Sequence, residues 1–548
     1  MIRSLHASFG IGLALFMGAA CGTSDPDTQG TTAGQPGSPT TGTSGAATTG
    51  TSGAGAGVSG SGALPTGGST STAGAAATAG DTGAGGSTGQ AGTGGGGTVP
   101  PVSLPEGVVT SANGAFWKAG TLTPSTSGTV DVTANDTSAK QRWDGFGGTF
   151  NEAGWDALAV LTDAERLQAL KLLFDAADGA NFAYGRLPIG ASDYSMKRYT
   201  LAETADDFEM KSFTIEQDKK LLIPYVKAAL AIKPDIHLWS SPWTPPAWMK
   251  TNNSTDSGNM KDDDKVLKAF ALYLEKYVQA YAAEGLKIEA VHPQNEPGYG
   301  TNPYPCAGWS SALYIKFIRD YLGPQFEKDN VPAEIWCGTM SNESDGTIAT
   351  TLANDSKAMS YVKGFGLQWN TRGVVGTLKS KGSVMQTEHK CGNYDFDTEN
   401  KASPYDPNKP QNDFAYGVES WKNIKAWIDA GVNSYSAWNM VLDTLGTNLN
   451  ASKPWHQNAL LVVDRGAKKL TATPAYYVFR HLSQYVSPKA TVIGTTGGDA
   501  LAFKNPDGKL VVVMYNSGGA KMATVSLGGT KFSFDMPANG WATVYHAK

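Results

Sequence analysis

Two glutamates, Glu296 and Glu388, stand where paired carboxylate chemistry is feasible. Glu296 lies in the stretch 292–297, HPQNEP, whose prolines prevent a helix and leave the glutamate on extended or turning backbone. Glu388 follows a short β-type run in the stretch 386–389, QTEH. Cleavage of a glycosidic bond needs such a pair, because one carboxyl group protonates the leaving oxygen and the other attacks or stabilises the anomeric carbon. Either glutamate alone could be an ordinary surface residue, but the pair predicts a glycosidase site.

Aromatic and polar residues gather at other points where strands are expected to end. These points matter because the catalytic groups of a (β/α)8 barrel lie at the C-terminal ends of its strands. A single Trp is more often a core residue than a platform for a sugar, yet several Trp residues beside paired carboxylates favour a sugar cleft. The strand-end residues in question are Arg186, Asp193, Trp243, Trp369, Asn370 and Trp438.

The elements that must position these residues alternate between β-type runs and helical patterns from about residue 141 to 487. Thr162 opens one helix with a capping-box pattern, and another helix is expected over 311–322 with a stop at Gly323-Pro324. This alternation predicts an α/β fold, a (β/α)8 TIM barrel, with catalytic residues at one mouth. A doubly wound open sheet is the alternative, but no Gly-rich phosphate loop follows the first strand. The expected strands cover 142–150, 182–189, 236–241, 288–294, 334–337, 365–369, 384–387 and 434–438.

A second domain is expected after a closing helix over 473–485. Beyond Pro488 the sequence changes to short alternating strands separated by Gly-rich turns, which predicts a side antiparallel β-sandwich over 488–548. The segment 103–140 contains a strand-like piece at 129–133 that we expect to join this β domain. The expected strands cover 490–493, 500–503, 510–515, 524–527 and 543–546.

The first 21 residues read as an export signal. Arg3 precedes an apolar run over 11–20, which is too short to span a bilayer. Small residues then precede Cys21, as at a bacterial lipoprotein processing site; the alternative is ordinary cleavage after Ala20. Residues 22–102 are mostly Gly, Ser, Thr and Ala and predict a disordered tether. We therefore expect an exported protein, either a cell-surface or outer-membrane lipoprotein lipidated at Cys21 or a secreted enzyme.

Several other functions find little support in the sequence. The net charge is −5 and no Lys/Arg-rich block occurs, so a nucleic-acid partner is not expected. His292 and Glu296 have the spacing of a zinc-protease motif, but the prolines forbid the helix that such a site needs. We expect no metal and no cofactor. Three cysteines beyond Cys21 leave their pairing open, as one disulfide or as free thiols: Cys306, Cys337 and Cys391.

The order of these motifs resembles glycoside hydrolase family 30, the glucosylceramidase-like enzymes. The similarity extends from about Trp143 through the terminal β domain. Asn-Glu-Pro alone would indicate only the wider clan of barrel glycosidases, whereas the ordered combination is specific. The stretches that carry it are 145–148 (GFGG), 186–193 (RLPIGASD), 241–244 (SPWT), 295–297 (NEP), 387–388 (TE) and 438–439 (WN).

The resemblance implies a retaining β-glycosidase with a β-sandwich built partly from the N-terminal strand. It implies that Glu296 is the acid/base and Glu388 the nucleophile, with Arg186 in contact with the nucleophile. Asn295 would hold the 2-hydroxyl of the sugar. The first sugar subsite would be formed by Asp193, Trp243 and Trp438.

These implied roles agree with simple electrostatics. Arg186 beside Glu388 would keep that carboxylate ionised, while burial and nearby negative charge would raise the pKa of Glu296. The two carboxyl groups of a retaining enzyme are expected to lie about 5–5.5 Å apart. One departure concerns Asn370, which stands where glucosylceramidases have a Tyr near the nucleophile. That difference puts a ceramide substrate in doubt, but not the barrel or the paired carboxylates.

Three functions remain open at this level. The first is a β-glycosidase acting on β-glucosides or β-glucans, with a glycolipid substrate and sphingolipid metabolism as one variant. The second keeps the chemistry and changes the substrate to another polysaccharide, such as a β-1,6-galactan, a β-fucoside or a xylan. The third is a non-catalytic carbohydrate-binding surface lipoprotein, which is disfavoured because a binding protein has no need of both glutamates.

Overall fold

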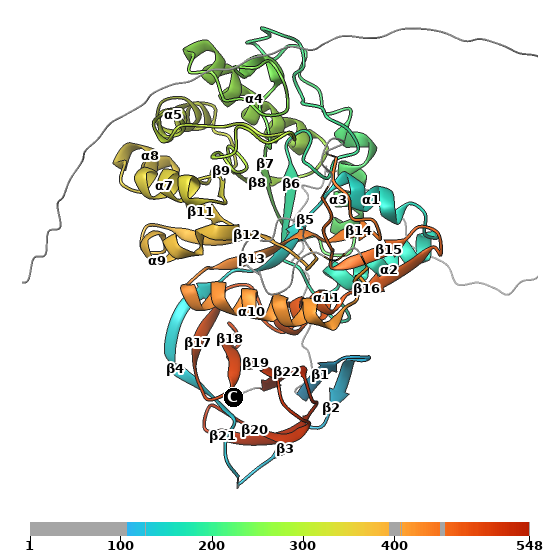
Figure 1. Ribbon diagram of the computed structural model, residues 1–548. Coiled ribbons are helices and arrows are strands. Elements are labelled where there is room, and N and C mark those ends of the chain that lie inside the picture. Colours follow the sequence, from blue (N-terminus) through green and yellow to red (C-terminus); the bar gives the residue numbers. More distant parts are fainter. Residues whose placement is uncertain (1–106, 127, 394–405, 407, 450–454, 547–548) are drawn as a thin grey trace, which may run out of the picture. The chain divides into compact units, whose positions relative to one another are not determined.

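The computed structural model describes residues 107–126, 128–393, 406, 408–449 and 455–546 (Figure 1). The expected export signal, Cys21 and the expected tether lie outside these residues. Across the part of the chain that is described, no helix is both long and apolar enough to cross a membrane.

Parallel strands form the central sheet, as the TIM-barrel prediction requires. The fifth strand is split in two around Gly338, whose φ of +63° lies in the left-handed region. Bridges from Asn295 to Thr339 and from Ile335 to Val362 link its two halves to the neighbouring strands and close the sheet. In chain order the strands are β5 (Gly145–Thr149), β6 (Tyr184–Pro188), β7 (His237–Ser241), β8 (Ile288–Val291), β9 (Glu334–Ile335), β10 (Thr339–Met340), β11 (Gly364–Leu367), β12 (Ser383–His389) and β13 (Ser434–Asn439).

Amphipathic helices connect the strands of the barrel. The Thr162 capping box is present at the start of α2, as the sequence predicts. The helix expected to stop at Gly323 instead continues to Lys328 through one π-helical turn, because Pro324 occupies the first turn of α6 and needs no hydrogen-bond partner for its nitrogen. The α-helices are α1 (Glu152–Leu158), α2 (Asp163–Phe174), α3 (Leu222–Leu230), α4 (Asp264–Ala283), α5 (Ser311–Phe317), α6 (Gly323–Lys328), α7 (Glu343–Leu352), α8 (Ser356–Tyr361), α9 (Val375–Leu378), α10 (Phe414–Ala430) and α11 (Pro474–Ser483).

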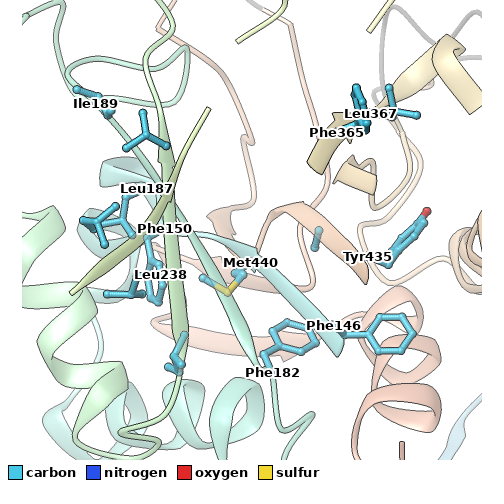
Figure 2. Close-up of a cluster of buried hydrophobic side chains, with 14 of the residues drawn as sticks. Phe146, Phe150, Phe182, Leu187, Ile189, Leu238, Phe365, Leu367, Tyr435 and Met440 are labelled. Atoms are coloured by element: carbon cyan, nitrogen blue, oxygen red, sulfur yellow. The ribbon is translucent and has the colours of Figure 1, made fainter. Parts of the chain in front are cut away.

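Aromatic side chains fill the space between the barrel strands and the helices. Phe146 on β5 and Phe182 just before β6 each pack edge-on against Phe479 of α11, with ring centroids 5.9 Å apart in both pairs. Figure 2 shows Phe146 and Phe182 together with other buried side chains of this cluster. Cys306, Cys337 and Cys391 are buried free thiols, so the open question about a disulfide is answered for these three residues.

A second sheet, largely antiparallel, forms the β domain predicted for the C-terminal part. Its strand β4 pairs with β17 in antiparallel and with β20 in parallel fashion, then leads directly into barrel strand β5 (Figure 1). The sequence did not predict β21 or the hairpin β1–β2. The sheet contains β1 (Gly107–Ala112), β2 (Ala115–Gly120), β3 (Thr123–Pro124), β4 (Val132–Trp143), β17 (Ala490–Thr496), β18 (Asp499–Lys504), β19 (Leu510–Asn516), β20 (Lys521–Leu527), β21 (Thr530–Met536) and β22 (Gly540–His546).

A small three-stranded sheet follows the last barrel strand and was also not predicted. It consists of β14 (Val441–Asp443), β15 (Leu461–Asp464) and β16 (Lys469–Ala472). Leu449, in the connection between β14 and β15, donates its backbone N–H to the carbonyl of Asp193. The small sheet thus anchors a loop beside the C-terminal ends of the barrel strands.

Candidate active site

Glu296 lies just beyond the C-terminal end of β8 in an unusual backbone conformation. Its φ of +49° is left-handed, a region that a residue with a side chain enters only when its surroundings hold it there. The N–H groups of Glu296 and Asn295 donate to Thr339 O at 2.9 Å and to Pro242 O at 2.8 Å. Backbone contacts from two neighbouring strand ends therefore fix the turn on which Glu296 stands.

Glu388 lies near the C-terminal end of β12 and is buried. The guanidinium of Arg186, which comes from β6, donates to Glu388 Oε1 and forms a buried ion pair with it. The indole N–H of Trp369 donates to Glu388 Oε2 at 3.1 Å. Both carboxylate oxygens therefore have a donor, and the orientation of the group is fixed.

Arg186 connects several strand ends at once. Its Nη2 donates to Asn295 Oδ1 at 2.7 Å and to Ser241 Oγ at 2.9 Å. The centre of its guanidinium lies 4.4 Å from the ring of Trp243 and 5.3 Å from the ring of Trp438. A fully buried cation at this place needs such partners, and it receives them from the charge, amide and aromatic groups around it.

Glu296 receives two hydrogen bonds from side chains that the sequence did not single out as site residues. Gln368 Nε2 donates to Glu296 Oε1 at 3.0 Å, and the hydroxyl of Tyr304 donates to Glu296 Oε2 at 3.1 Å. Gln368 was visible as the end of the expected sixth strand. Tyr304 lies in the loop after Glu296, where no local pattern marks it.

The two glutamates differ in their electrostatic surroundings. Burial, and next the charge of Glu388, raises the pKa of Glu296 to about 8. Burial also raises the pKa of Glu388, but Arg186 opposes that shift through its charge and its hydrogen bond. Arg186 therefore favours the charged form of Glu388, whereas the surroundings of Glu296 favour its protonated form.

Aromatic rings gather beside Arg186, the cation that pairs with Glu388. Trp243 and Trp438 stack on each other with centroids 5.1 Å apart, and Tyr194 meets Trp438 edge-on at 5.9 Å. Asp193 lies in the same region and is buried; its burial, together with the charge of Glu388, raises its pKa to about 8. Asn370 is exposed instead, and its backbone N–H donates to Ser341 O. The structure thus brings the other candidate residues together, whereas the side chain of Asn370 is exposed.

Metal-binding geometry is not evident at this site. Within the described ranges, no group of three or more His, Cys, Asp or Glu side chains is arranged to hold a metal ion. His292 uses Nδ1 to bond Gly338 O, and burial lowers its pKa to about 3. The imidazole is therefore neutral, with Nδ1 carrying the proton.

Comparison with known proteins gives this site a family. Residues 143–486 match the model of the glycosyl hydrolase family 30 TIM-barrel domain, and residues 489–544 match that of the family 30 beta sandwich domain. The chain belongs to glycosyl hydrolase family 30. It is therefore a glycoside hydrolase, and the fold class and the glycosidase activity predicted from the sequence are confirmed.

Individual members of the family are similar along most of their length. The lysosomal acid glucosylceramidase of Mus musculus is 26% identical and aligns over 69% of this chain and 75% of its own. The endo-1,6-beta-D-glucanase neg1 of Aspergillus fumigatus is 26% identical over 77% of this chain and 88% of its own. The solved structure of the endo-beta1,6-glucanase BT3312 superposes with a TM-score of 0.71 and 25% identity, covering 81% of this chain and 99% of that one.

Proposed function

We propose that this family 30 enzyme is a retaining β-glycosidase in which Glu388 is the nucleophile and Glu296 the acid/base. One observation carries the proposal: two carboxyl groups share a buried site, yet only Glu388 is paired with Arg186. Unequal surroundings of this kind assign one carboxyl group as the charged partner and the other as the proton donor.

In the first step, Glu388 attacks the anomeric carbon and the bond from that carbon to the leaving oxygen breaks. Glu296 transfers its proton to the leaving oxygen, so no alkoxide has to depart. Arg186 and Trp369 keep the two oxygens of Glu388 in a fixed orientation for this attack. The product of the step is a glycosyl ester on Glu388.

In the second step, water replaces Glu388 at the anomeric carbon. Formation of the ester removes the negative charge of Glu388, which is one of the causes that raise the pKa of Glu296. Glu296, ionised after the first step, then accepts a proton from water as the water oxygen attacks. Two displacements at the same carbon restore its original configuration.

The proposed substrates are β-glucosides or β-glucans. Support comes from the similar proteins, which include a glucosylceramidase and endo-1,6-beta-glucanases. Trp243, Trp438 and Asp193 form the proposed first sugar subsite, with Asn295 holding the 2-hydroxyl and Asn370 at the outer edge. A glycolipid or another polysaccharide with the same linkage chemistry remains an alternative substrate, and the assay below separates them.

Export and lipid attachment at Cys21 belong to the same proposal, because an enzyme for external glycans has to reach them. The support is the sequence pattern of residues 1–21 and the Gly/Ser/Thr-rich segment behind it. Mass spectrometry of the mature N-terminus in a bacterial host tests it. A diacylglyceryl group on Cys21 supports the anchor, whereas an unmodified N-terminus contradicts it.

The test of the reaction is hydrolysis of aryl β-glycosides and β-glucans by the tether-free protein, compared with Glu388→Gln. We expect turnover to fall by roughly four orders of magnitude in that variant, because no ester can form. Glu296→Ala should keep activity on dinitrophenyl β-glucoside, whose leaving group needs little protonation, and added azide should yield the β-glycosyl azide. An α-glycosyl azide would contradict the retaining mechanism.

The substrate is read from the same panel. Release of the aryl group from an aryl β-glucoside supports an exo-acting glucosidase, and glucosylceramide is then the next substrate to assay. Release from a polymer alone assigns the enzyme to the polysaccharide group. Sugar binding without turnover on any substrate would favour the carbohydrate-binding protein and contradict the enzymatic proposal.

A further inference from the structure

A third carboxylate, Asp345, lies behind the loop that carries Glu296. Asp345 belongs to the first turn of α7 and is fully buried. Its Oδ1 accepts the backbone N–H of Gly298, two residues beyond Glu296. Its Oδ2 accepts the N–H of Ser341 at 2.8 Å and the hydroxyl of Ser341 at 2.9 Å. The side chain thus ties the Glu296 loop to the segment between β10 and α7.

The donors around Asp345 favour its charged form. An ionised carboxylate can accept at both oxygens, whereas a protonated one must turn a hydrogen toward a neighbour. The groups that hydrogen-bond the carboxylate of Asp345 all donate to it, and these bonds oppose the rise in its pKa, to about 6, that burial causes. Near neutral pH Asp345 therefore places a negative charge behind the loop.

Gly298 makes the close approach between loop and carboxylate feasible. A Cβ atom at this position would lie only 2.5 Å from Asp345 Oδ1 and 2.9 Å from the side-chain nitrogen of Asn342. Asn342 is itself engaged, since its side chain caps α7. A side chain at position 298 would push the loop away from α7 and would displace Glu296 with it.

Glu296 is held on both sides by this arrangement. On one side its own N–H is fixed to Thr339 O, and on the other the N–H of Gly298 is fixed to Asp345. Glu296 itself keeps the left-handed backbone noted above. Two fixed points around a strained residue define the direction in which its carboxyl group enters the site.

The charges that face Glu296 come from several elements. Burial has the largest effect on its pKa, followed by the charges of Glu388 on β12 and Asp345 on α7, with a further contribution from Asp193 after β6. Arg186 is the cation in this group, and it is paired with Glu388. The remaining titratable neighbours are neutral near pH 7, because burial, and to a smaller extent the charge of Glu296, raises their pKa values: Tyr299, Tyr304 and Cys306.

We propose that Asp345 is a positioning residue for the acid/base: it fixes the Glu296 loop through Gly298, and its negative charge helps Glu296 to keep its proton. This inference rests on the acid/base role proposed for Glu296. Asp345 itself has no contact with the substrate in the proposed mechanism. Its effect on the reaction passes through the position and the protonation of Glu296.

The test compares Asp345→Asn with the unchanged enzyme on two β-glucosides that differ in their leaving groups. The dinitrophenolate group leaves with little protonation, whereas departure of an alkyl alcohol depends on the general acid. We expect kcat/KM to fall by about tenfold on the alkyl substrate and by less than about threefold on the dinitrophenyl substrate. The basic limb of the pH profile should also move to lower pH, because one negative charge near Glu296 is lost.

Asp355→Asn is the matched control. Asp355 caps α8 by accepting the N–H of Ala358, much as a capping residue at α7 would, but it pairs with Arg319 and is not among the charges that act on Glu296. This variant should lower the melting temperature without changing the pH profile or the ratio of the two substrates. Gly298→Ala gives a second variant, which should lower kcat on the alkyl substrate while Asp345 keeps its charge.

Two outcomes separate the inference from the function on which it rests. If Asp345→Asn leaves the basic limb of the pH profile in place and lowers kcat/KM equally on both substrates, Asp345 has only a structural role and the inference is wrong. If Glu296→Ala loses activity equally on both substrates, the acid/base role proposed for Glu296 is itself wrong. If Asp345→Asn shifts the basic limb to lower pH and lowers kcat/KM mainly on the alkyl substrate, the result supports both the acid/base role of Glu296 and the positioning role of Asp345.

Discussion

The two ends of strand β8 carry glutamates with opposite behaviour. Glu289 lies within β8 toward its N-terminal end and bonds His237 at 2.7 Å and Lys287 at 3.1 Å, in a partly exposed position. The hydrogen bond from His237 lowers the pKa of Glu289 to about 2. Glu296, just beyond the other end, has its pKa raised to about 8 by burial and by Glu388.

The contrast shows what converts an ordinary glutamate into a reactive one. At the N-terminal end, the partly exposed carboxylate of Glu289 has the Lys287 ammonium and a hydrogen bond from His237 beside it, so its charged form is stabilised. At the C-terminal end, several buried carboxyl groups share the cation Arg186, and one of them has to keep a proton. The residue type is the same, so the difference comes first from burial and then from the neighbouring groups.

The largest expected effect comes from altering the shared cation. Arg186→Lys keeps a positive charge but loses the planar fork that reaches Glu388, Asn295 and Ser241 together. We expect kcat/KM to fall by roughly a hundredfold. Arg198→Lys is the control, because Arg198 pairs with Asp256 in a partly exposed position outside the carboxyl group cluster. An equal loss of kcat/KM in the two variants would contradict a special role for Arg186.

A second prediction concerns the pH dependence of turnover. Glu296 donates a proton only while it holds one, so kcat/KM should decline as the pH rises through about 8. Above that pH the decline should approach tenfold per unit. The profile is measured with an alkyl β-glucoside and repeated with Glu289→Gln, which should have the same basic limb. A limb that moves in the Glu289 variant would mean that the two ends are not independent.

Stability should also depend on pH in a direction set by the buried carboxyl groups. Folding raises the pKa values of Glu296 and Asp193 to about 8 and that of Asp218 to about 7, so the folded state holds protons that the unfolded state releases. The stability conferred by these groups is therefore lost as the pH rises from about 4 to about 8. We expect a higher melting temperature at about pH 5.5 than at about pH 8.5. Asp218→Asn should reduce the difference, and a melting temperature that rises with pH would contradict the assignment.

The smallest effect is expected at the N-terminal end itself. Glu289→Gln removes a partly exposed ion pair, which contributes about 0–1 kcal/mol to stability. Turnover should stay within about twofold of the unchanged enzyme, as for other surface substitutions. Activity assays and thermal melts at neutral pH measure both quantities. A large loss of activity would show that charges at both ends of β8 act on the site.

Sequence patterns predicted the barrel and its two strand-end glutamates because both depend on local signals. Buried strands appear as short apolar runs, and the residue after each run falls at the mouth of the barrel. The prolines beside Glu296 marked it as a turn residue, and the structure has it in a left-handed turn. Glu388 was found in the same way, at the end of a run that the structure contains as β12.

Local patterns could not predict which residues contact Glu296 or its loop. Gln368 is 72 positions away in the chain, and Asp345 reaches the loop from another helix, so tertiary packing alone brings them together. The β domain shows a different kind of failure. Strand β21 has alternating buried residues at Phe532, Phe534 and Met536, so a period-two signal typical of a strand is present there. The short strands β14–β16 offered too few residues for any period to show.

Strand β4 is synthesised long before the strands with which it pairs. Its partners on β17 lie roughly 350 residues further along the chain, so this pairing closes a very long loop. A ribosome releases β4 and all the barrel strands well before β17 and β20 exist. Until then β4 presents an edge that any other nascent chain could pair with. Synthesis of the last segment therefore ends the period in which this protein is most prone to aggregate.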